Sequence, residues 1–111
     1  MHRKIKLFSD IVNSINLIEE FLGPINLFEE YSVDLKTKSA IERQLGIIGE
    51  AIKRLKEIDP TELIKYQHDI IGFRNIIIHN YDGLDDTLVW SIIKEDLVSL
   101  KKEVLAKLET Q

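Results

Sequence analysis

Apolar residues recur every three or four positions along most of the chain, and this spacing constrains the fold more than any other feature. In the first part of the sequence it is carried by Ile5, Phe8, Ile11, Val12, Ile15, Ile18 and Leu22. Residues at these steps lie on one face of a helix, so the spacing predicts an amphipathic helix over residues 3 to 22. No stretch shows the period-two alternation of a half-buried strand. The spacing therefore predicts an all-α fold.

The first break follows that helix directly. Gly23 and Pro24 end it, and "PINLFEEY" allows a short second helix with Pro24 in its first turn. Ser32 or Asp34 can cap a third helix that runs to about residue 58. The apolar stripe of this third helix consists of Ile41, Leu45, Ile48, Ile52 and Leu55.

The next helix has two candidate starting points. Asp59 can cap it, with Pro60 in the first turn and Glu62 at the spacing of a capping box. The helix can instead begin later, near Gln67. The sequence leaves both starts open.

A last helix follows the break "NYDGLDD", with Asp85 or Asp86 as its cap. Its apolar side consists of Leu88, Ile92, Leu97, Leu100, Val104 and Leu108. With this helix the chain has four long or medium helices and a short one. We expect an antiparallel helical bundle of four to five helices, in a single domain covering residues 1–111.

Three bulk properties limit the class of protein. The chain contains no cysteine, which excludes disulfides and cysteine-ligated metals. No apolar run approaches the ~20 residues needed to span a bilayer, so we expect no membrane association and a cytoplasmic location. The formal net charge of −4 argues against a protein that coats nucleic acid generally, because such proteins have basic surfaces.

The charges are nevertheless unevenly placed. Residues 36–56 carry six basic side chains against two acidic ones, whereas residues 19–34 carry five acidic side chains and no basic one. Such runs are commonly just solvated faces. The alternative is a real asymmetry, with one face for an anion and another for a basic partner.

Glycines occupy positions where helices favour alanine. Gly46 and Gly49 lie three residues apart in the third helix, and each costs up to about 1 kcal/mol relative to alanine. We therefore expect another backbone to approach this side of the helix closely. Gly72 raises the same expectation for the fourth helix.

The segment "GFRNIIIHNYDG" carries an unusual number of polar groups among its isoleucines. On a helical projection, Arg74 falls at the centre of an apolar arc that includes Ile70 and Ile77. A buried guanidinium needs a negatively charged partner. That partner can be a carboxylate such as Glu50, or a bound phosphate, whose geometry suits the guanidinium fork.

A second strip on the same helix contains His68, Gly72, Asn75 and His79. It carries no carboxylate at ligand spacing, so we predict no metal site. Arg74 and His79 point about 140° apart on an ideal helix, too far to grip one small group. The helix can end at His79, the arginine can bend round, or two copies of the chain can face each other across one cleft. The last arrangement predicts a dimer.

Three stretches together resemble a known family. They are "RQLGIIGEAIKRL" (43–55), "IIGFRNIIIHNYDG" (70–83) and "TLVWSIIKEDLVSLKKEV" (87–104), and the second contains the pattern R-x-x-x-x-H. In these features the chain resembles the HEPN superfamily and, more narrowly, the HepT toxins of toxin–antitoxin systems. The resemblance implies a metal-independent endoribonuclease without a cofactor, acting on tRNA or mRNA. It also implies a homodimer with active sites in the cleft between subunits.

The resemblance assigns roles to four residues. Arg74 and His79 correspond to the catalytic pair, and Asn75 to a supporting polar residue after the arginine. Tyr81 corresponds to the tyrosine that a cognate MntA-like nucleotidyltransferase antitoxin modifies with AMP. Asn80 stands where relatives often carry glycine.

The chemistry suits these residue types. RNA supplies its own nucleophile, the 2′-hydroxyl group. The pKa of a histidine such as His79 lies near the working pH, so it can accept or deliver the proton. Arg74 can neutralise charge on the transition state.

Two other interpretations remain open at the level of sequence. The chain could be a non-catalytic helical subunit that binds a nucleotidyltransferase partner or a nucleotide. It could also be a structural dimeric bundle in which the polar strip forms a buried interface network. Metal-independent RNA cleavage that is lost with Arg74 distinguishes the enzyme from both.

Overall fold

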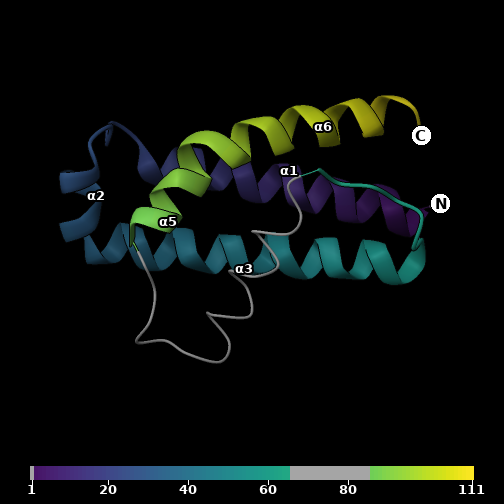
Figure 1. The fold of residues 1–111 in the computed structure, drawn as a ribbon, viewed down its shortest axis with the longest axis horizontal. Coiled ribbons are helices and arrows are strands. Elements are labelled where there is room, and N and C mark those ends of the chain that lie inside the picture. The colour runs from purple at the N-terminus through teal and green to yellow at the C-terminus, as the bar shows by residue number, and fades with distance from the viewer. Residues whose placement is uncertain (1, 66–85) are drawn as a thin grey trace.

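Two long antiparallel helices, α1 (His2–Leu22) and α3 (Leu35–Ile58), form the frame of the bundle (Figure 1). The computed structural model describes residues 2–65 and 86–111. The predicted apolar stripes of both helices are buried in one continuous core, with Ile11 and Ile48 completely inaccessible to solvent. The prediction of these two helices is confirmed, and burial of their apolar stripes explains why they pair.

The ends of the two helices follow local sequence signals. Gly23 ends α1 with a positive φ of 55°, a conformation that glycine adopts without a Cβ penalty. Asp34 caps α3, because its Oδ1 accepts a hydrogen bond from the Thr37 backbone N–H at 3.1 Å. The Thr37 hydroxyl donates to Oδ2 at 2.9 Å. Of the two predicted caps, Asp34 is therefore confirmed.

The short helix α2 (Phe28–Val33) begins later than predicted. The backbone N–H of Ile25 donates to the Leu22 carbonyl at 3.0 Å, which closes a turn over Gly23 and Pro24. The predicted place of Pro24 in the first helical turn is therefore wrong. The proline belongs to the turn that reverses the chain, and the helix starts only after the extended residue Leu27.

The predicted helix start at Asp59 is also wrong. Residues 59–65 form turns and irregular chain, and the Asp59 backbone N–H donates to Leu55 at 2.8 Å as the last hydrogen bond of α3. The Asp59 carboxylate accepts from the Thr61 backbone N–H and hydroxyl, at 3.0 and 2.6 Å, and so organises a turn. Glu62 binds two lysines instead of completing a capping box. The alternative start near Gln67 lies outside the described residues.

The C-terminal part is one continuous helix with a change of winding. It consists of α5 (Asp86–Ser91), a π-helical turn η2 (Ile92–Asp96) and α6 (Leu97–Glu109) (Figure 1). The Leu97 backbone N–H donates to the carbonyl of Ile92, five residues earlier, which defines the π turn. The described part of this helix begins at Asp86, one of its two predicted caps, and the other, Asp85, lies outside the described residues.

The π turn explains one error in the predicted apolar side of this helix. Ile92, Leu97, Leu100 and Val104 are buried as predicted, and Leu108 packs against the core while only partly buried. Leu88, however, is 41% exposed, and Val89 takes its place in the core. Because the π turn inserts one residue, both Ile92 and Ile93 face inwards. Val89, one turn before Ile92 and Ile93, lies on the same buried side of the helix.

The described residues form helices and no strand, which confirms the all-α bundle. α1 packs against α3 on one side and against α6 on another (Figure 1). Within the described residues of one chain no backbone makes the predicted close approach at Gly46, where an added Cβ would meet nothing within 4 Å. Gly49 is buried on α3, and Gly72 lies outside the described residues. In the two described ranges, no helix is long and apolar enough to cross a membrane.

Candidate functional site

The predicted site residues Arg74, Asn75, His79 and Tyr81 all lie between residues 66 and 85, outside the described part of the chain. Their mutual geometry therefore stays a prediction. The structure does describe the residues on either side of this stretch, which end at Lys65 and resume at Asp86. These flanking residues are held in two chemically different ways.

A cluster of four charged side chains, which we call the ionic end, precedes the stretch. It consists of Lys4 on α1, Asp59 and Glu62 after α3, and Lys107 on α6. The Lys4 ammonium lies 2.9 Å from Asp59 Oδ2 and 2.8 Å from Glu62 Oε1. The Lys107 ammonium lies 2.8 Å from Glu62 Oε2. Glu62 therefore uses both carboxylate oxygens to join α1 to α6, with its side chain only 14% exposed.

Hydrogen bonding shifts the pKa values of the ionic end. Hydrogen bonds from Lys107 and Lys4 lower the pKa of the Glu62 carboxyl. The Thr61 hydroxyl, followed by Lys4, lowers the pKa of Asp59 to about 2. The same contacts, that with Glu62 first, raise the pKa of Lys4. Each of these three shifts favours the charged form of its group.

The last described residues before the gap are attached to the bundle as well. Ile64 is 3% exposed and belongs to the hydrophobic core. The backbone N–H of Lys65 donates to both carboxylate oxygens of Glu103 on α6, at 3.1 and 3.0 Å. The chain therefore enters residues 66–85 from a point fixed against α6.

On the other side of the gap, Asp86 is held by Lys38. The Lys38 ammonium lies 2.7 Å from Asp86 Oδ2 and also donates to the Ser32 carbonyl at 3.3 Å. Both partners of the ion pair are largely buried, with side chains 17% and 25% exposed. Glu42 lies in the same region, and its pKa is raised, chiefly by burial.

Three rings beside this ion pair form what we call the aromatic end: Phe28 and Tyr31 of α2 and Trp90 of α5. The Tyr31 and Trp90 ring centroids are 5.4 Å apart, and Phe28 meets Trp90 edge-on at 6.3 Å. Tyr31 is completely buried, and burial raises the pKa of its phenol. Its hydroxyl has no hydrogen-bond partner among residues 2–65 and 86–111, and an unpaired buried hydroxyl costs free energy because buried polar groups are normally paired.

The charge asymmetry predicted from sequence is partly neutralised by the fold. In the basic stretch, Lys38 is paired with Asp86, and Arg54 Nε lies 3.4 Å from Glu50 Oε1. In the acidic stretch, Glu19 is paired with Lys101 at 3.3 Å and Asp34 serves as a cap. The predicted alternative pairing of Arg74 with Glu50 involves a residue outside the described ranges.

A hollow of about 240 Å³ opens between α1 and α3 near Glu50. It is lined by Leu7, Asp10, Ile47, Glu50, Ala51 and Arg54. Over residues 2–65 and 86–111, no three histidine, cysteine, aspartate or glutamate side chains gather closely enough to hold a metal ion. The charged groups that line the hollow are the carboxylates of Asp10 and Glu50 and the guanidinium of Arg54.

Neither the ionic end nor the aromatic end was predicted from the sequence. The members of the ionic end are spread from Lys4 to Lys107, and no local pattern links them. The π turn did leave a signal, since Ile92 and Leu97 are five residues apart and an uninterrupted α-helix would not place both in the core.

Comparison with known proteins identifies several relatives. The profile of the family described as Ribonuclease HepT-like matches residues 11–106. A provisionally named RNase of Methanocaldococcus jannaschii is 38% identical over 107 residues, covering 92% of this chain and 94% of that protein. The probable ribonuclease HepT of Thermococcus cleftensis is 41% identical over 96 residues, covering 83% of this chain and 84% of that protein.

A further relative is a longer protein. It is named as a gamma-glutamylcyclotransferase and provisional RNase of Methanocaldococcus jannaschii, and it is 34% identical over 115 residues. The match covers 98% of this chain but 50% of that protein, so the chain spans half of its length. No solved structure gives a significant match.

Proposed function

This chain belongs to the HepT-like ribonuclease family, and on that premise we propose that it is a metal-independent endoribonuclease toxin that acts as a homodimer. The family match over residues 11–106 carries the proposal, because it includes the whole R-x-x-x-x-H stretch. It confirms the predicted family and, at the level of the family, the predicted ribonuclease activity. The residue roles, the dimer and the antitoxin that follow are proposals.

The proposed reaction uses the RNA's own 2′-hydroxyl as nucleophile. It attacks the adjacent phosphorus, the bond to the 5′-oxygen of the next nucleotide breaks, and a 2′,3′-cyclic phosphate remains. His79 accepts the proton from the 2′-hydroxyl or delivers one to the leaving oxygen, and a histidine of the second subunit takes the other role. Arg74 neutralises the developing charge on the phosphate oxygens, and Asn75 orients His79 or the phosphate.

The attachments on both sides of residues 66–85 support a catalytic use of that stretch. Catalytic groups work only when they are held close to their productive positions. Lys65 is bound to Glu103 before the stretch, and Asp86 is bound to Lys38 after it. The segment that carries the motif is therefore joined to the bundle by polar contacts at both ends.

The outer face of α1 and α3 supports the proposed homodimer. Leu17 and Phe21 lie one turn apart on α1, Ile47 lies on α3, and each of these three large apolar side chains is 38% exposed. Ile47 also lines the hollow between the two helices, and Gly46 beside it faces open space among the described residues. A second copy of the chain would cover these groups.

A two-fold axis on this face would bring opposite charges of two copies together, in addition to the pairs that Asp10 forms with Lys6 and Arg54 with Glu50 within one chain. Asp10 lies in the hollow with Ile47 and Arg54, whereas Arg43 lies one turn of α3, about 6 Å, beyond Ile47 in the opposite direction. A two-fold axis passing between the helices near Ile47 would bring Asp10 over the partner's Arg43, and Arg43 over the partner's Asp10. The same axis would bring Phe21 over the partner's Arg54, a favourable cation–π arrangement.

Charge exchange tests this interface. Asp10→Arg places two arginines against each other, so we expect it to weaken the dimer at least tenfold in sedimentation equilibrium. The double variant Asp10→Arg/Arg43→Asp restores opposite charges and should restore the dimer. Glu109→Arg, the same reversal of charge at an exposed glutamate of α6, should have no effect. A dimer that tolerates Asp10→Arg assembles through another face.

Cleavage of tRNA and mRNA by wild type and His79→Ala tests the enzyme itself. With EDTA present, wild type should leave 2′,3′-cyclic phosphate ends, and the variant should lose about 10² to 10⁴ in rate. His68→Ala removes a histidine of the same strip that is not part of the motif, and it should stay active. Full activity of His79→Ala would reject the assignment. An inactive wild type would favour the alternative, a non-catalytic helical subunit for a nucleotidyltransferase or a nucleotide.

We further propose that a cognate MntA-like nucleotidyltransferase neutralises the enzyme by transferring AMP to Tyr81. The modification would add a bulky, negatively charged group two residues from His79 and so exclude RNA by charge and volume. Mass spectrometry after incubation with ATP and the transferase should find one added AMP, absent from Tyr81→Phe. Neutralised toxicity with an unmodified Tyr81 would reject this mechanism.

A further inference from the structure

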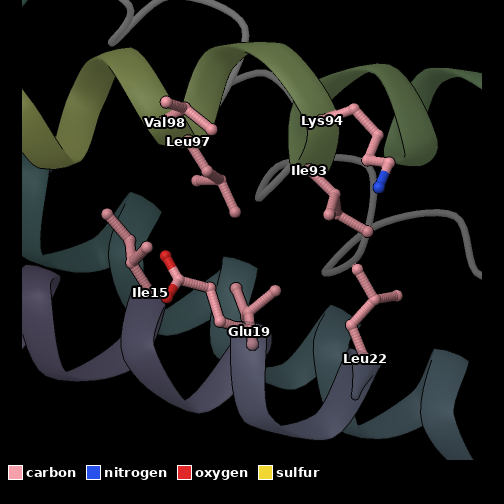
Figure 2. A pocket seen from close by; sticks show the side chains of 8 residues that line it. Ile15, Glu19, Leu22, Ile93, Lys94, Leu97 and Val98 are labelled. Atoms are coloured by element: carbon pink, nitrogen blue, oxygen red, sulfur yellow. The ribbon is translucent and has the colours of Figure 1, made fainter. Parts of the chain in front are cut away.

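A pocket of about 320 Å³ lies between α1 and the C-terminal helix (Figure 2). Its lining consists of Ile15, Ile18, Glu19, Leu22, Ile93, Lys94, Leu97 and Val98. Six of these eight side chains are aliphatic. Figure 2 shows Ile93 and Leu97 pointing from the C-terminal helix towards α1, into the space between the two helices. The pocket is thus an apolar recess that opens on the surface of the bundle, built entirely from described residues.

One wall of the pocket is the π turn. Ile93 and Lys94 belong to this turn, and Leu97 follows it directly. Single π turns are rare, because their winding is less favourable than that of an α-helix, and they occur frequently at functional sites. Here the irregular winding places an aliphatic side chain and a cation side by side at the same recess.

The charges at the mouth of the pocket do not balance. The Glu19 carboxylate is neutralised by Lys101, whose ammonium lies 3.3 Å from Oε1. The Lys94 ammonium instead donates to the Asn26 side-chain oxygen at 3.0 Å and lies 5.0 Å from the centroid of the Trp90 ring. Both of these partners are neutral. Within the described ranges no carboxylate lies within ion-pair distance of Lys94, so the mouth carries one uncompensated positive charge.

We propose that this pocket binds a small amphipathic anion, with an aliphatic or aromatic body in the recess and a single carboxylate or similar acidic group at Lys94. The volume lies near the lower limit of small-molecule sites, about 300 Å³, which excludes large ligands. The aliphatic walls provide the affinity for the body of the ligand. Lys94, already oriented by Asn26 and Trp90, selects for the negative charge. This site is separate from the proposed ribonuclease activity and does not depend on it.

Binding of octanoate, octanol and octylamine to the full chain tests the proposal, because the three probes share a tail and differ in head-group charge. In isothermal titration calorimetry we expect one saturable site for octanoate, with an affinity at least tenfold higher than that for octanol and no measurable binding of octylamine. Lys94→Gln should reduce the affinity for octanoate to that for octanol. Lys102→Gln, a matched change at an exposed lysine of the same helix, should leave it unchanged.

A second pair of variants locates the site. Val98 is 49% exposed and lines the pocket, whereas Leu105 is 42% exposed on the same side of α6 and does not. Both positions tolerate a polar side chain without loss of the core, which circular dichroism can check. Val98→Glu should abolish octanoate binding, and Leu105→Glu should preserve it. Failure of wild type to bind octanoate, equal affinity for octanol, or unchanged binding in Val98→Glu would each overturn the proposal, whatever the outcome of the RNA cleavage assay.

Discussion

The two ends of the bundle are closed by opposite kinds of chemistry. The ionic end joins α1, α6 and the chain after α3 through Glu62, which binds Lys4 and Lys107 at 2.8 Å each. The aromatic end joins α2 to α5 through the rings of Tyr31 and Trp90, supported by the ion pair between Lys38 and Asp86. One end relies on charged groups near solvent, and the other relies on burial of large rings.

This difference determines what each end contributes. A partly exposed ion pair typically stabilises a protein by 0 to about 1 kcal/mol, because both ions are also well solvated in the unfolded chain. A buried aromatic ring removes about 150 to 250 Å² of surface from water. The aromatic end should therefore carry more of the stability. The ionic end should mainly fix the direction in which the chain leaves α3.

The largest expected effect is at the aromatic end. Tyr31→Ala removes a completely buried ring and leaves a cavity beside Trp90. We expect a loss of about 3–5 kcal/mol in the free energy of unfolding. Urea denaturation followed by circular dichroism measures it. A loss below about 1 kcal/mol would show that the aromatic end does not dominate stability.

A smaller loss is expected at the ionic end. Glu62→Gln keeps the shape of the side chain but removes the charge that binds Lys4 and Lys107. We expect a loss of up to about 2 kcal/mol, because the variant removes two partly exposed ion pairs that each typically contribute 0 to about 1 kcal/mol. Glu57→Gln, at an exposed position of α3, is the matched control and should change little. Equal losses in the two variants would mean that the cluster has no energetic role.

Substitution of the same tyrosine by phenylalanine should have the opposite sign. Tyr31→Phe keeps the ring and removes a hydroxyl that has no hydrogen-bond partner in the described part of the chain. Because the native state no longer buries an unpaired polar group, we expect a gain of up to about 1 kcal/mol in the free energy of unfolding. Urea denaturation beside wild type resolves this. A clear loss would show that the hydroxyl has a partner in solution, such as an ordered water.

The smallest expected effect is a difference in the response to acid. The pKa of Asp59 is about 2 in the folded state against its usual 3.8, and that of Glu62 is also lowered. Groups with a lowered folded-state pKa stabilise the protein above their usual pKa, and this contribution disappears as the pH falls towards the folded value. The ionic end should therefore weaken between about pH 4.5 and pH 2.

Glu42, near the aromatic end, should respond in the opposite direction. Burial raises its pKa above the usual 4.5, so the folded state takes up a proton more readily than the unfolded chain. Its contribution to stability therefore increases as the pH falls from above its folded-state pKa to below 4.5. Glu42→Gln removes this stabilising contribution of Glu42 at low pH. Between pH 7 and pH 3 the variant should therefore lose more stability than wild type, by less than about 1 kcal/mol. Unfolding curves at pH 7 and pH 3 compare the two proteins, and identical acid responses would contradict the assignment to Glu42.

Helices α1 and α3 and the ionic end show how much of the fold could be predicted from the sequence. Helices α1 and α3 could be placed because their apolar residues repeat with the period of a helix and Asp34 is a local cap. Asp59 misled the prediction, because its carboxylate has the same local pattern whether it starts a helix or closes a turn. Its actual role depends on Lys4, which is far away in sequence.

The candidate site was predicted by a different route. Helical projection predicted a buried position for Arg74 and a polar strip with His79, but periodicity could not bring the two side chains together. Their roles came from the resemblance of the whole segment to a family, and the family is confirmed by the match over residues 11–106. The recess beside Lys94 could not be anticipated, because it depends on how α1 and the C-terminal helix pack.

The π turn also makes the C-terminal helix unequally sensitive to changes in its length. Because this turn holds one residue more than an α-helical turn, deleting one residue between Ile92 and Asp96 would leave an uninterrupted α-helix. Val89 and Leu97 would then be seven positions apart, and seven residues at about 100° each return to nearly the same face. Val89 would therefore still face the core together with Leu97, Leu100 and Val104. Insertion of a further residue would have no such compensation and would rotate the two halves of the helix against each other by about 100°.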